Sequence, residues 1–147
     1  MDKIDDKWIK GQDPIDVFQH LLQKAKQTES IKEPTAMTLS TSDQAGRLSS
    51  RIVLLKKIDA GEFIFFTNYD SQKGVELAKN SMVALNFYWD PLAIQVRVRG
   101  TARKTSREES VDYWRGRPRK SQLAQAISRQ SQVAQSRHQL EELVQLA

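Results

Sequence analysis

The first strong pattern in the chain is an apolar stripe at helical spacing. Asp13 can cap a helix, and Pro14 suits the first helical position. The residues that follow on one face are Ile15, Phe18, Leu21, Leu22 and Ala25. The pattern predicts an amphipathic helix that begins at residue 14 and ends before Glu33-Pro34. Residues 1–12 are polar, and we expect them to be a flexible N-terminal segment.

Short apolar runs separated by turn residues follow this helix. They predict strands at residues 36–41, 49–58, 62–67, 81–89 and 93–101, with turns at 42–46, 59–61 and 90–91. The first links are too short for crossover helices, so we expect antiparallel neighbours. The run 81–89 is apolar on both faces and therefore predicts a central strand. A short helix is expected at residues 71–79.

The last part of the chain has a helical pattern. Ser106 and Glu109 form a capping box for a helix that ends near Arg115, and Gly116 and Pro118 break it. Further helices are expected from residue 121 and from about residue 131. Strands with peripheral helices predict a mainly β (β+α) fold, a small antiparallel barrel, with residues 13–147 as one domain.

Composition narrows the class of protein. The chain has 147 residues, 28% of them charged and 39% hydrophobic, which fits one soluble globular domain. No apolar run is long enough to span a membrane, and the first residues do not form a signal peptide, so we expect a cytoplasmic protein. Cysteine is absent, and the two histidines have no partner at ligand spacing, so no metal site is predicted.

The net charge of +5 admits two kinds of anionic partner. Basic proteins bind nucleic acid or phosphorylated small molecules, and positive charge is dense at residues 97–119. That segment contains no nucleic-acid motif. A basic nucleic-acid-binding module therefore remains only as an alternative hypothesis, with salt-sensitive binding as its signature.

The segment 51–73 carries the most specific chemistry. Two apolar strands end in hydroxyl, amide and cationic residues, and Arg51 and Lys56 at strand ends favour an anion. This segment resembles the flavin-phosphate strands of the pyridoxamine 5′-phosphate oxidase family. Residues 86–89, 95–98, 113–122 and 128–131 match the same family in the same order. The resemblance covers roughly residues 13–146 and implies an FMN-binding split barrel.

The resemblance implies a set of cofactor-binding residues. Arg51 and Lys73 are expected to bind the FMN phosphate, and Ser71 opens the helix that carries Lys73. The backbone of residues 51–56 and the side chain of Gln95 are expected along the polar edge of the ring. The full set is Arg51, Ile52, Val53, Leu54, Leu55, Lys56, Phe66, Thr67, Gln72, Lys73, Gln95, Gln130 and Ser131. Without the family, Arg51 reads as an ion-pair residue at the barrel rim and Lys73 as a solvated charge.

The implied substrate-phosphate residues are Lys56, Tyr113, Arg117 and Ser121. The last three are spaced by four, but Pro118 prevents one continuous helix, so we expect them to converge from a helix end and the following loop. In a continuous strand Arg51 and Lys56 would face opposite sides, which suits two separate phosphates.

The implied reaction is oxidation of pyridoxamine or pyridoxine 5′-phosphate to pyridoxal 5′-phosphate (PLP), with O₂ reduced to H₂O₂, in a homodimer that binds FMN between subunits. The sequence departs from the family at Gln72, Phe66 and Gln125. The family's C-terminal segment, with its substrate arginine and histidine, has no counterpart, so no catalytic residue is assigned. We expect this chain to bind PLP better than it turns over pyridoxamine 5′-phosphate. An FMN-binding homologue with weak activity or another ring substrate is the alternative.

Overall fold

The computed structural model describes residues 10–127, 131, 136 and 138. Contacts divide the chain into two compact units. Unit 1 comprises Met1–Ser40, Ser49–Phe65 and Val83–Gly100, and unit 2 comprises Thr41–Leu48, Phe66–Met82 and Thr101–Ala147. The predicted segment 1–12 lies outside the described residues except for 10–12, and so does most of the helix predicted from residue 131.

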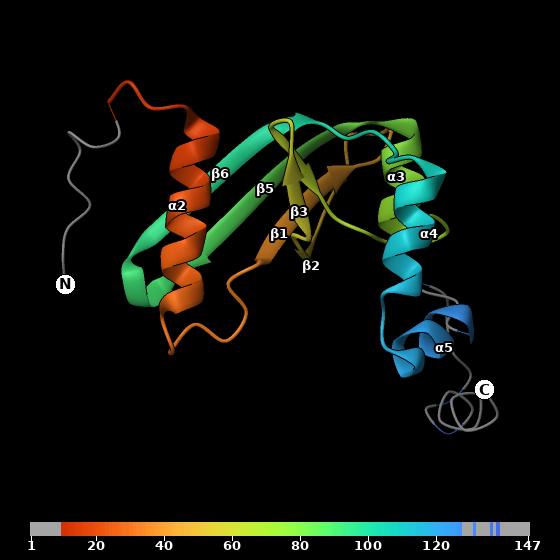
Figure 1. Cartoon of the computed structure of the whole chain (residues 1–147). Coiled ribbons are helices and arrows are strands. Elements are labelled where there is room, and N and C mark those ends of the chain that lie inside the picture. The colour runs from red at the N-terminus through yellow and green to blue at the C-terminus, as the bar shows by residue number, and fades with distance from the viewer. Residues whose placement is uncertain (1–9, 128–130, 132–135, 137, 139–147) are drawn as a thin grey trace. The chain divides into compact units, whose positions relative to one another are not determined.

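The main sheet has four strands in the order β2-β1-β5-β6. They are β1 (Ala36–Ser42), β2 (Leu48–Leu54), β5 (Met82–Trp89) and β6 (Ile94–Thr101). β1 and β5 pair antiparallel, with Leu39 opposite Leu85. β3 (Lys57–Asp59) and β4 (Glu62–Ile64) form a separate antiparallel pair. The predicted antiparallel fold with peripheral helices is confirmed, and β5 is an internal strand (Figure 1).

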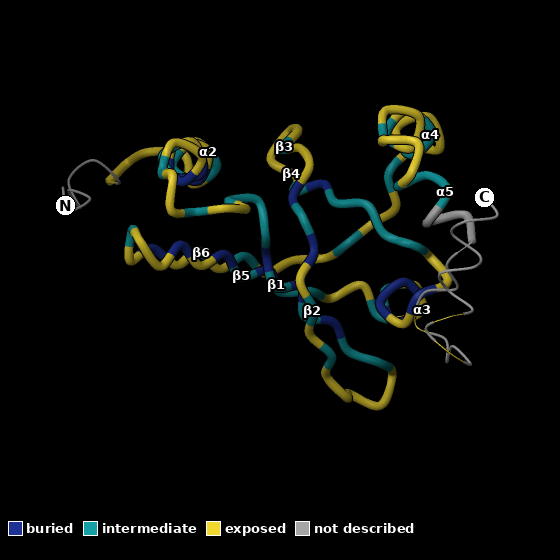
Figure 2. Tube along the Cα trace, turned by 90° about the horizontal axis from the view of Figure 1, so that it is seen from below, coloured by how far each residue is buried: buried dark blue, intermediate teal, exposed yellow. Residues whose placement is uncertain are grey.

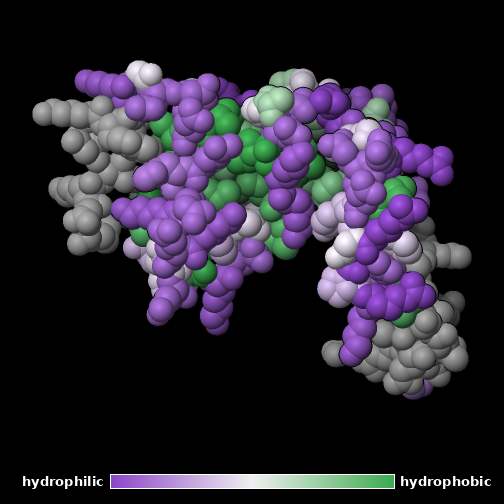
Figure 3. All heavy atoms as spheres, viewed as in Figure 1, coloured by the Kyte–Doolittle hydropathy of each residue, from purple (hydrophilic) through white to green (hydrophobic). Residues whose placement is uncertain are grey.

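Helix α2 (Pro14–Gln27) builds the core of unit 1. The Asp13 carboxylate caps it by accepting a hydrogen bond from the Ile15 amide at 2.7 Å, as the sequence predicts. The Phe18 ring lies 4.9 Å from Phe63 and 4.8 Å from Phe87 between ring centroids. Figure 2 shows α2 and the β3–β4 hairpin on the same face of the sheet, and Figure 3 shows hydrophobic side chains gathered between α2 and the strands.

The other face of the sheet is open to solvent in this single chain. Alternation along β1, β2 and β5 buries one face and turns the other outward. The outward face combines polar residues with large apolar ones: Ile52 is 64% exposed and Tyr88 is 61% exposed. The two apolar faces predicted for residues 81–89 are therefore unequal, since one packs in the core and the other is exposed.

The prediction of one strand over 49–58 is wrong. β2 ends at Leu54, and the next amides change partner: the Leu55 amide donates to the Thr35 carbonyl at 2.9 Å and the Lys56 amide to the Ile64 carbonyl at 2.8 Å. After this switch of partner the chain forms the hairpin β3–β4. The strand predicted at 62–67 is therefore shorter than expected, since β4 ends at Ile64. The predicted turn at 59–61 is confirmed, with positive φ at Ala60 and Gly61.

The helices of unit 2 are α3 (Gln72–Lys79), α4 (Arg107–Arg115) and α5 (Arg119–Ile127). The capping box is confirmed, because the Ser106 hydroxyl accepts from the Glu109 amide and the Glu109 carboxylate accepts from the Ser106 amide, both at 3.1 Å. α5 begins at Arg119, two residues before the predicted start. Across residues 10–127, no helix is long and apolar enough to cross a membrane.

Candidate functional site

The predicted site residues are divided between the two units. Unit 1 contains residues 51–56 and Gln95, and unit 2 contains Phe66, Thr67, Gln72, Lys73, Tyr113, Arg117 and Ser121. Within unit 2, the structure groups these residues around the start of α3 and around the α4–α5 turn. Gln130 lies outside the described residues, and Ser131 is an exposed turn residue with a φ of 67°.

The start of α3 places a cation at a helix N-terminus. Ser71 is fully buried and caps the helix, since its hydroxyl accepts from the Gly74 amide at 3.4 Å and donates to the Asn68 carbonyl at 2.6 Å. The Lys73 amine donates to the same hydroxyl at 3.1 Å, and the residue is only 8% exposed. The ammonium and the N-terminal backbone dipoles both favour an anion here. Lys73 is therefore not the solvated helix charge of the alternative interpretation.

Gly74 makes this tight arrangement possible. A Cβ atom at Gly74 would lie 2.3 Å from the Tyr69 carbonyl oxygen and 2.6 Å from its carbonyl carbon. Both are backbone atoms, so no side chain can rotate away. The first turn of α3 therefore requires glycine at this position, because the loop before it passes too close for any side chain.

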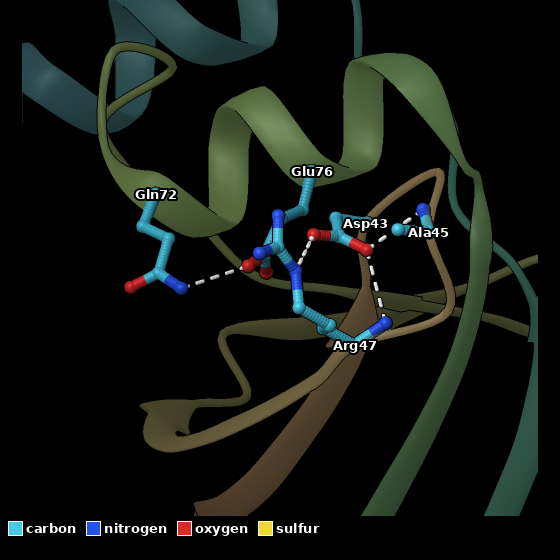
Figure 4. A network of polar contacts seen from close by, with 5 residues as sticks. All are labelled: Asp43, Ala45, Arg47, Gln72 and Glu76. Atoms are coloured by element: carbon cyan, nitrogen blue, oxygen red, sulfur yellow. Dashed lines mark hydrogen bonds and ion pairs between the residues drawn. The ribbon is translucent and has the colours of Figure 1, made fainter.

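A buried carboxylate supports the same helix (Figure 4). Glu76 is buried; it accepts a hydrogen bond from the Thr41 hydroxyl and another, at 2.9 Å, from the Gln72 amide nitrogen. Gln72 stands where the family usually has a basic residue, and here its amide group binds Glu76. Nearby, hydrogen bonds from the Arg47 side chain and backbone lower the pKa of the Asp43 carboxyl.

Three predicted residues from different segments meet in unit 2. The Phe66 and Tyr113 rings are stacked, with centroids 3.8 Å apart and planes 5° from parallel. The Arg117 guanidinium carbon lies 5.9 Å from the centroid of the Tyr113 ring. Phe66 directly precedes Thr67, so a predicted FMN residue and a predicted substrate residue are adjacent through this stack. The sequence predicts Phe66 as an FMN residue that departs from the family's tyrosine, but it does not predict the stacking on Tyr113.

The turn between α4 and α5 brings Arg117 and Ser121 close to the end of α4. Tyr113 is in α4, Arg117 lies two residues after the end of α4, and Ser121 is in the first turn of α5, so the expected break at Pro118 is confirmed. The Ser121 amide donates to the Pro118 carbonyl at 2.8 Å. Gln122 contributes a contact that the sequence analysis missed, since its side-chain amide binds backbone carbonyls of this turn.

In unit 1, β2 is the edge strand of the four-stranded sheet. Within that sheet, one row of its backbone N–H and C=O groups therefore faces no neighbouring strand. Arg51 lies on the inner face of β2, where its guanidinium donates to the carbonyls of Leu39 at 3.4 Å and Ser49 at 3.3 Å. Because β2 ends before Lys56, the continuous-strand argument for opposite faces does not apply to Arg51 and Lys56.

Gln95 lies on the outward face of β6, as the alternation predicts. Its side-chain amide nitrogen donates to the Asn86 amide oxygen on β5 at 2.8 Å. In this orientation the Gln95 oxygen can accept a further hydrogen bond. An N–H group at the polar edge of a ring is a suitable donor for that oxygen.

The buried Lys73 at the start of α3 is of a type that binds an anion, and comparison with known proteins identifies the family. The family model described as pyridoxamine 5′-phosphate oxidase matches residues 23–144. The chain therefore belongs to the pyridoxamine 5′-phosphate oxidase family. The resemblance stated from the sequence is confirmed.

Two relatives are named pyridoxine/pyridoxamine 5′-phosphate oxidase. The protein of Bacteroides thetaiotaomicron is 48% identical over 128 residues, covering 87% of this chain and 60% of that protein. The protein of Legionella pneumophila strain Paris is 47% identical over 130 residues, covering 88% and 60%. The chain spans about 60% of the length of these relatives.

Two solved structures share the fold. PhzG from Burkholderia lata 383, solved in complex with tetrahydrophenazine-1-carboxylic acid, aligns with a TM-score of 0.90 at 28% identity, covering 99% of this chain and 74% of that chain. A pyridoxamine 5′-phosphate oxidase-related, FMN binding protein from Nostoc punctiforme PCC 73102 aligns with a TM-score of 0.67 at 15% identity, covering 89% and 71%. The predicted fold class is confirmed by these neighbours.

Proposed function

We propose that this chain is part of an FMN-dependent oxidase that converts pyridoxamine or pyridoxine 5′-phosphate to PLP, with O₂ as the electron acceptor and H₂O₂ as the second product. The observation that carries the proposal is the contact of Tyr113 with both Phe66 and Arg117, in a chain that belongs to this family. Two predicted substrate residues are thereby grouped beside Phe66, a residue predicted to bind the cofactor.

The residues present fit FMN by the chemistry of their donors. In unit 2, Lys73 and the first turn of α3 suit a phosphate. In unit 1, Arg51 is a cation of the kind that binds a phosphate, and the backbone of the edge strand β2 and the oxygen of Gln95 suit the polar edge of a flavin ring. When bound, FMN supplies the hydride acceptor of the reaction.

The chain's own residues would bind and orient the substrate. Arg117 offers a planar pair of N–H donors that matches a phosphate, and Tyr113 offers a hydroxyl one helical turn earlier. Both would act on a group remote from the reacting carbon, so that binding energy holds the substrate ring in place. Lys56 and Ser121 complete the proposed phosphate set.

A homodimer is part of the proposal. The outward face of the sheet exposes Ile52 and Tyr88 beside Gln95, and a second copy would cover this apolar surface. Light scattering at micromolar concentration with FMN present should give twice the mass of the chain. Ile52→Asp should shift that mass toward the monomer, while Gln19→Asp on the exposed side of α2 should not. A monomer for the wild type refutes the dimer.

FMN binding is tested by titration of the purified apo protein, with quenching of FMN fluorescence as the signal. Arg51→Ala should weaken binding by about 1.5–3 kcal/mol, the range for a hydrogen bond to a charged group. Arg107→Ala, at an exposed arginine in the first turn of α4, is the matched control and should leave the affinity unchanged. No quenching at tens of micromolar FMN would reject the cofactor assignment.

A second candidate has a specific observation behind it. The likeness to PhzG, whose structure holds a tetrahydrophenazine carboxylic acid, favours a flavin oxidase for another ring substrate with an anionic group. Arg117 would bind a carboxylate as well as a phosphate. PLP and H₂O₂ formation from pyridoxamine 5′-phosphate, measured beside oxidation of tetrahydrophenazine-1-carboxylic acid, separates the two. Activity on the tetrahydrophenazine alone would replace the first proposal by the second.

A further inference from the structure

In the α4–α5 turn, the backbone carbonyl groups obtain hydrogen-bond donors in an unusual way. The last carbonyl groups of a helix have no partner within the helix. Helices often solve this with a residue in the left-handed conformation, but Gly116 at the end of α4 has a φ of −73° and a ψ of −6°. Pro118 has no N–H group to donate. The Arg117 amide donates to the Trp114 carbonyl at 3.2 Å, and further donors for the carbonyls of this turn must come from elsewhere.

Gln122 supplies them from the next helix. Its side-chain amide nitrogen lies 3.0 Å from the Trp114 carbonyl oxygen, 3.2 Å from that of Arg115 and 3.1 Å from that of Arg117. Carbonyl oxygens only accept hydrogen bonds, so the NH₂ group of Gln122 must point at them. Its own oxygen accepts from the Arg119 guanidinium at 3.4 Å, which agrees with this orientation.

We propose that Gln122 is a positioning residue for the substrate phosphate, because it holds the turn that presents Arg117. This inference rests on the proposed function. The Arg117 carbonyl is bound directly, and this fixes the backbone from which the guanidinium extends. Tyr113 is held by the stacked Phe66 ring. Ser121 is the neighbour of Gln122 in α5, so Gln122 joins both parts of the predicted phosphate set.

Gln122 is expected to affect the direction of the Arg117 guanidinium and not the charge of the site. A bidentate contact of a guanidinium with a phosphate depends on direction as well as distance. If the NH₂ group is removed, the carbonyls of Arg115 and Arg117 lose this donor, while the Trp114 carbonyl keeps the Arg117 amide, and the backbone at Arg117 gains freedom. Affinity for a phosphorylated ligand should then fall, while FMN binding, which is proposed to use Arg51 and Lys73, should not.

The test uses two variants of the full chain loaded with FMN. Gln122→Met keeps the length of the side chain without its donors, and Gln122→Glu keeps its shape but places a second oxygen against the carbonyls. Gln19→Glu, on an exposed position of α2, is the matched control for the added negative charge. PLP and pyridoxal, which lacks the phosphate, are each titrated, and the affinity for FMN and the melting temperature are measured beside them.

Both Gln122 variants should weaken PLP binding on the order of tenfold, a loss in the range for a misaligned charge-assisted contact. Pyridoxal binding and FMN affinity should be unchanged, and Gln19→Glu should match the wild type. Equal PLP affinity in wild type and variants overturns the inference alone. Parallel loss of FMN, PLP and pyridoxal binding also overturns it, because that result means a purely structural role. A wild type that binds FMN but no PLP overturns the proposed substrate and this inference with it.

Discussion

Replacing Gly74 by alanine tests the geometry of the α3 N-terminus directly. In an open helix this change is stabilising by about 0.4–1 kcal/mol, because glycine loses more backbone entropy on folding than alanine. Here the new Cβ would lie 2.3 Å from the Tyr69 carbonyl oxygen, and the helix must move away from the loop. Overpacking of this kind costs about 1–3 kcal/mol. The clash should therefore exceed the gain, and we expect a net destabilisation of about 1–2 kcal/mol.

The same movement should weaken FMN binding, since it displaces the Ser71 cap and the Lys73 amine that depends on it. Chemical denaturation gives the free energy of unfolding, and the melting temperature should fall by about 2–4 °C for each kcal/mol in a chain of this size. Gly100→Ala is the matched control, because nothing lies within 4 Å of a Cβ at that position. A Gly74→Ala protein as stable as the wild type, with unchanged FMN affinity, would refute the close approach.

Three further changes address other contacts of unit 2. Phe66→Ala should remove a stacking contribution of about 0.5–1.5 kcal/mol, which a double-mutant cycle with Tyr113→Ala measures; a zero coupling energy contradicts the stack. Glu76→Leu should lower the free energy of unfolding by about 1–3 kcal/mol because the buried Thr41 hydroxyl loses its carboxylate partner, and urea denaturation checks this. Asp43 has a lowered pKa, so its contribution is present above its unfolded pKa of 3.8 and is lost as pH falls through the folded value. Asp43→Asn should therefore reduce the acid dependence of the melting temperature, and an unchanged acid profile would argue against it.

Local signals predicted most of the fold. Asp13-Pro14 and the Ser106–Glu109 capping box each act within a few residues, so the helix starts could be placed from sequence. The break in the strand after Leu54 could not, since Leu55 continues the apolar run of residues 52–54 and no glycine or proline follows it before Gly61. The partner switch there depends on Thr35 and Ile64, which are remote in sequence.

The candidate site could likewise be predicted only in part from the sequence. The family motif identified Lys73 and Arg117, but their surroundings depend on tertiary contacts. No periodicity shows that Gly74 faces the Tyr69 backbone, and nothing in the sequence indicates that Gln122 binds the carbonyls at the end of α4. Gln122 does lie within the matched segment 113–122. A polar residue one turn into a helix that follows a Gly–Pro break is a signal that could have drawn attention to it.

The tryptophans offer an optical reading of the two units. Trp89 is buried in unit 1, where its indole N–H donates to the Pro34 carbonyl at 2.9 Å, while Trp114 in α4 of unit 2 is 40% exposed. Replacing Trp8 and one of these two by phenylalanine leaves a single emitter that reports one unit. Emission from the enclosed indole should shift to longer wavelength when its unit opens. Coincident denaturation curves for the two emitters would show that both units unfold as one cooperative body, and separated curves would show two.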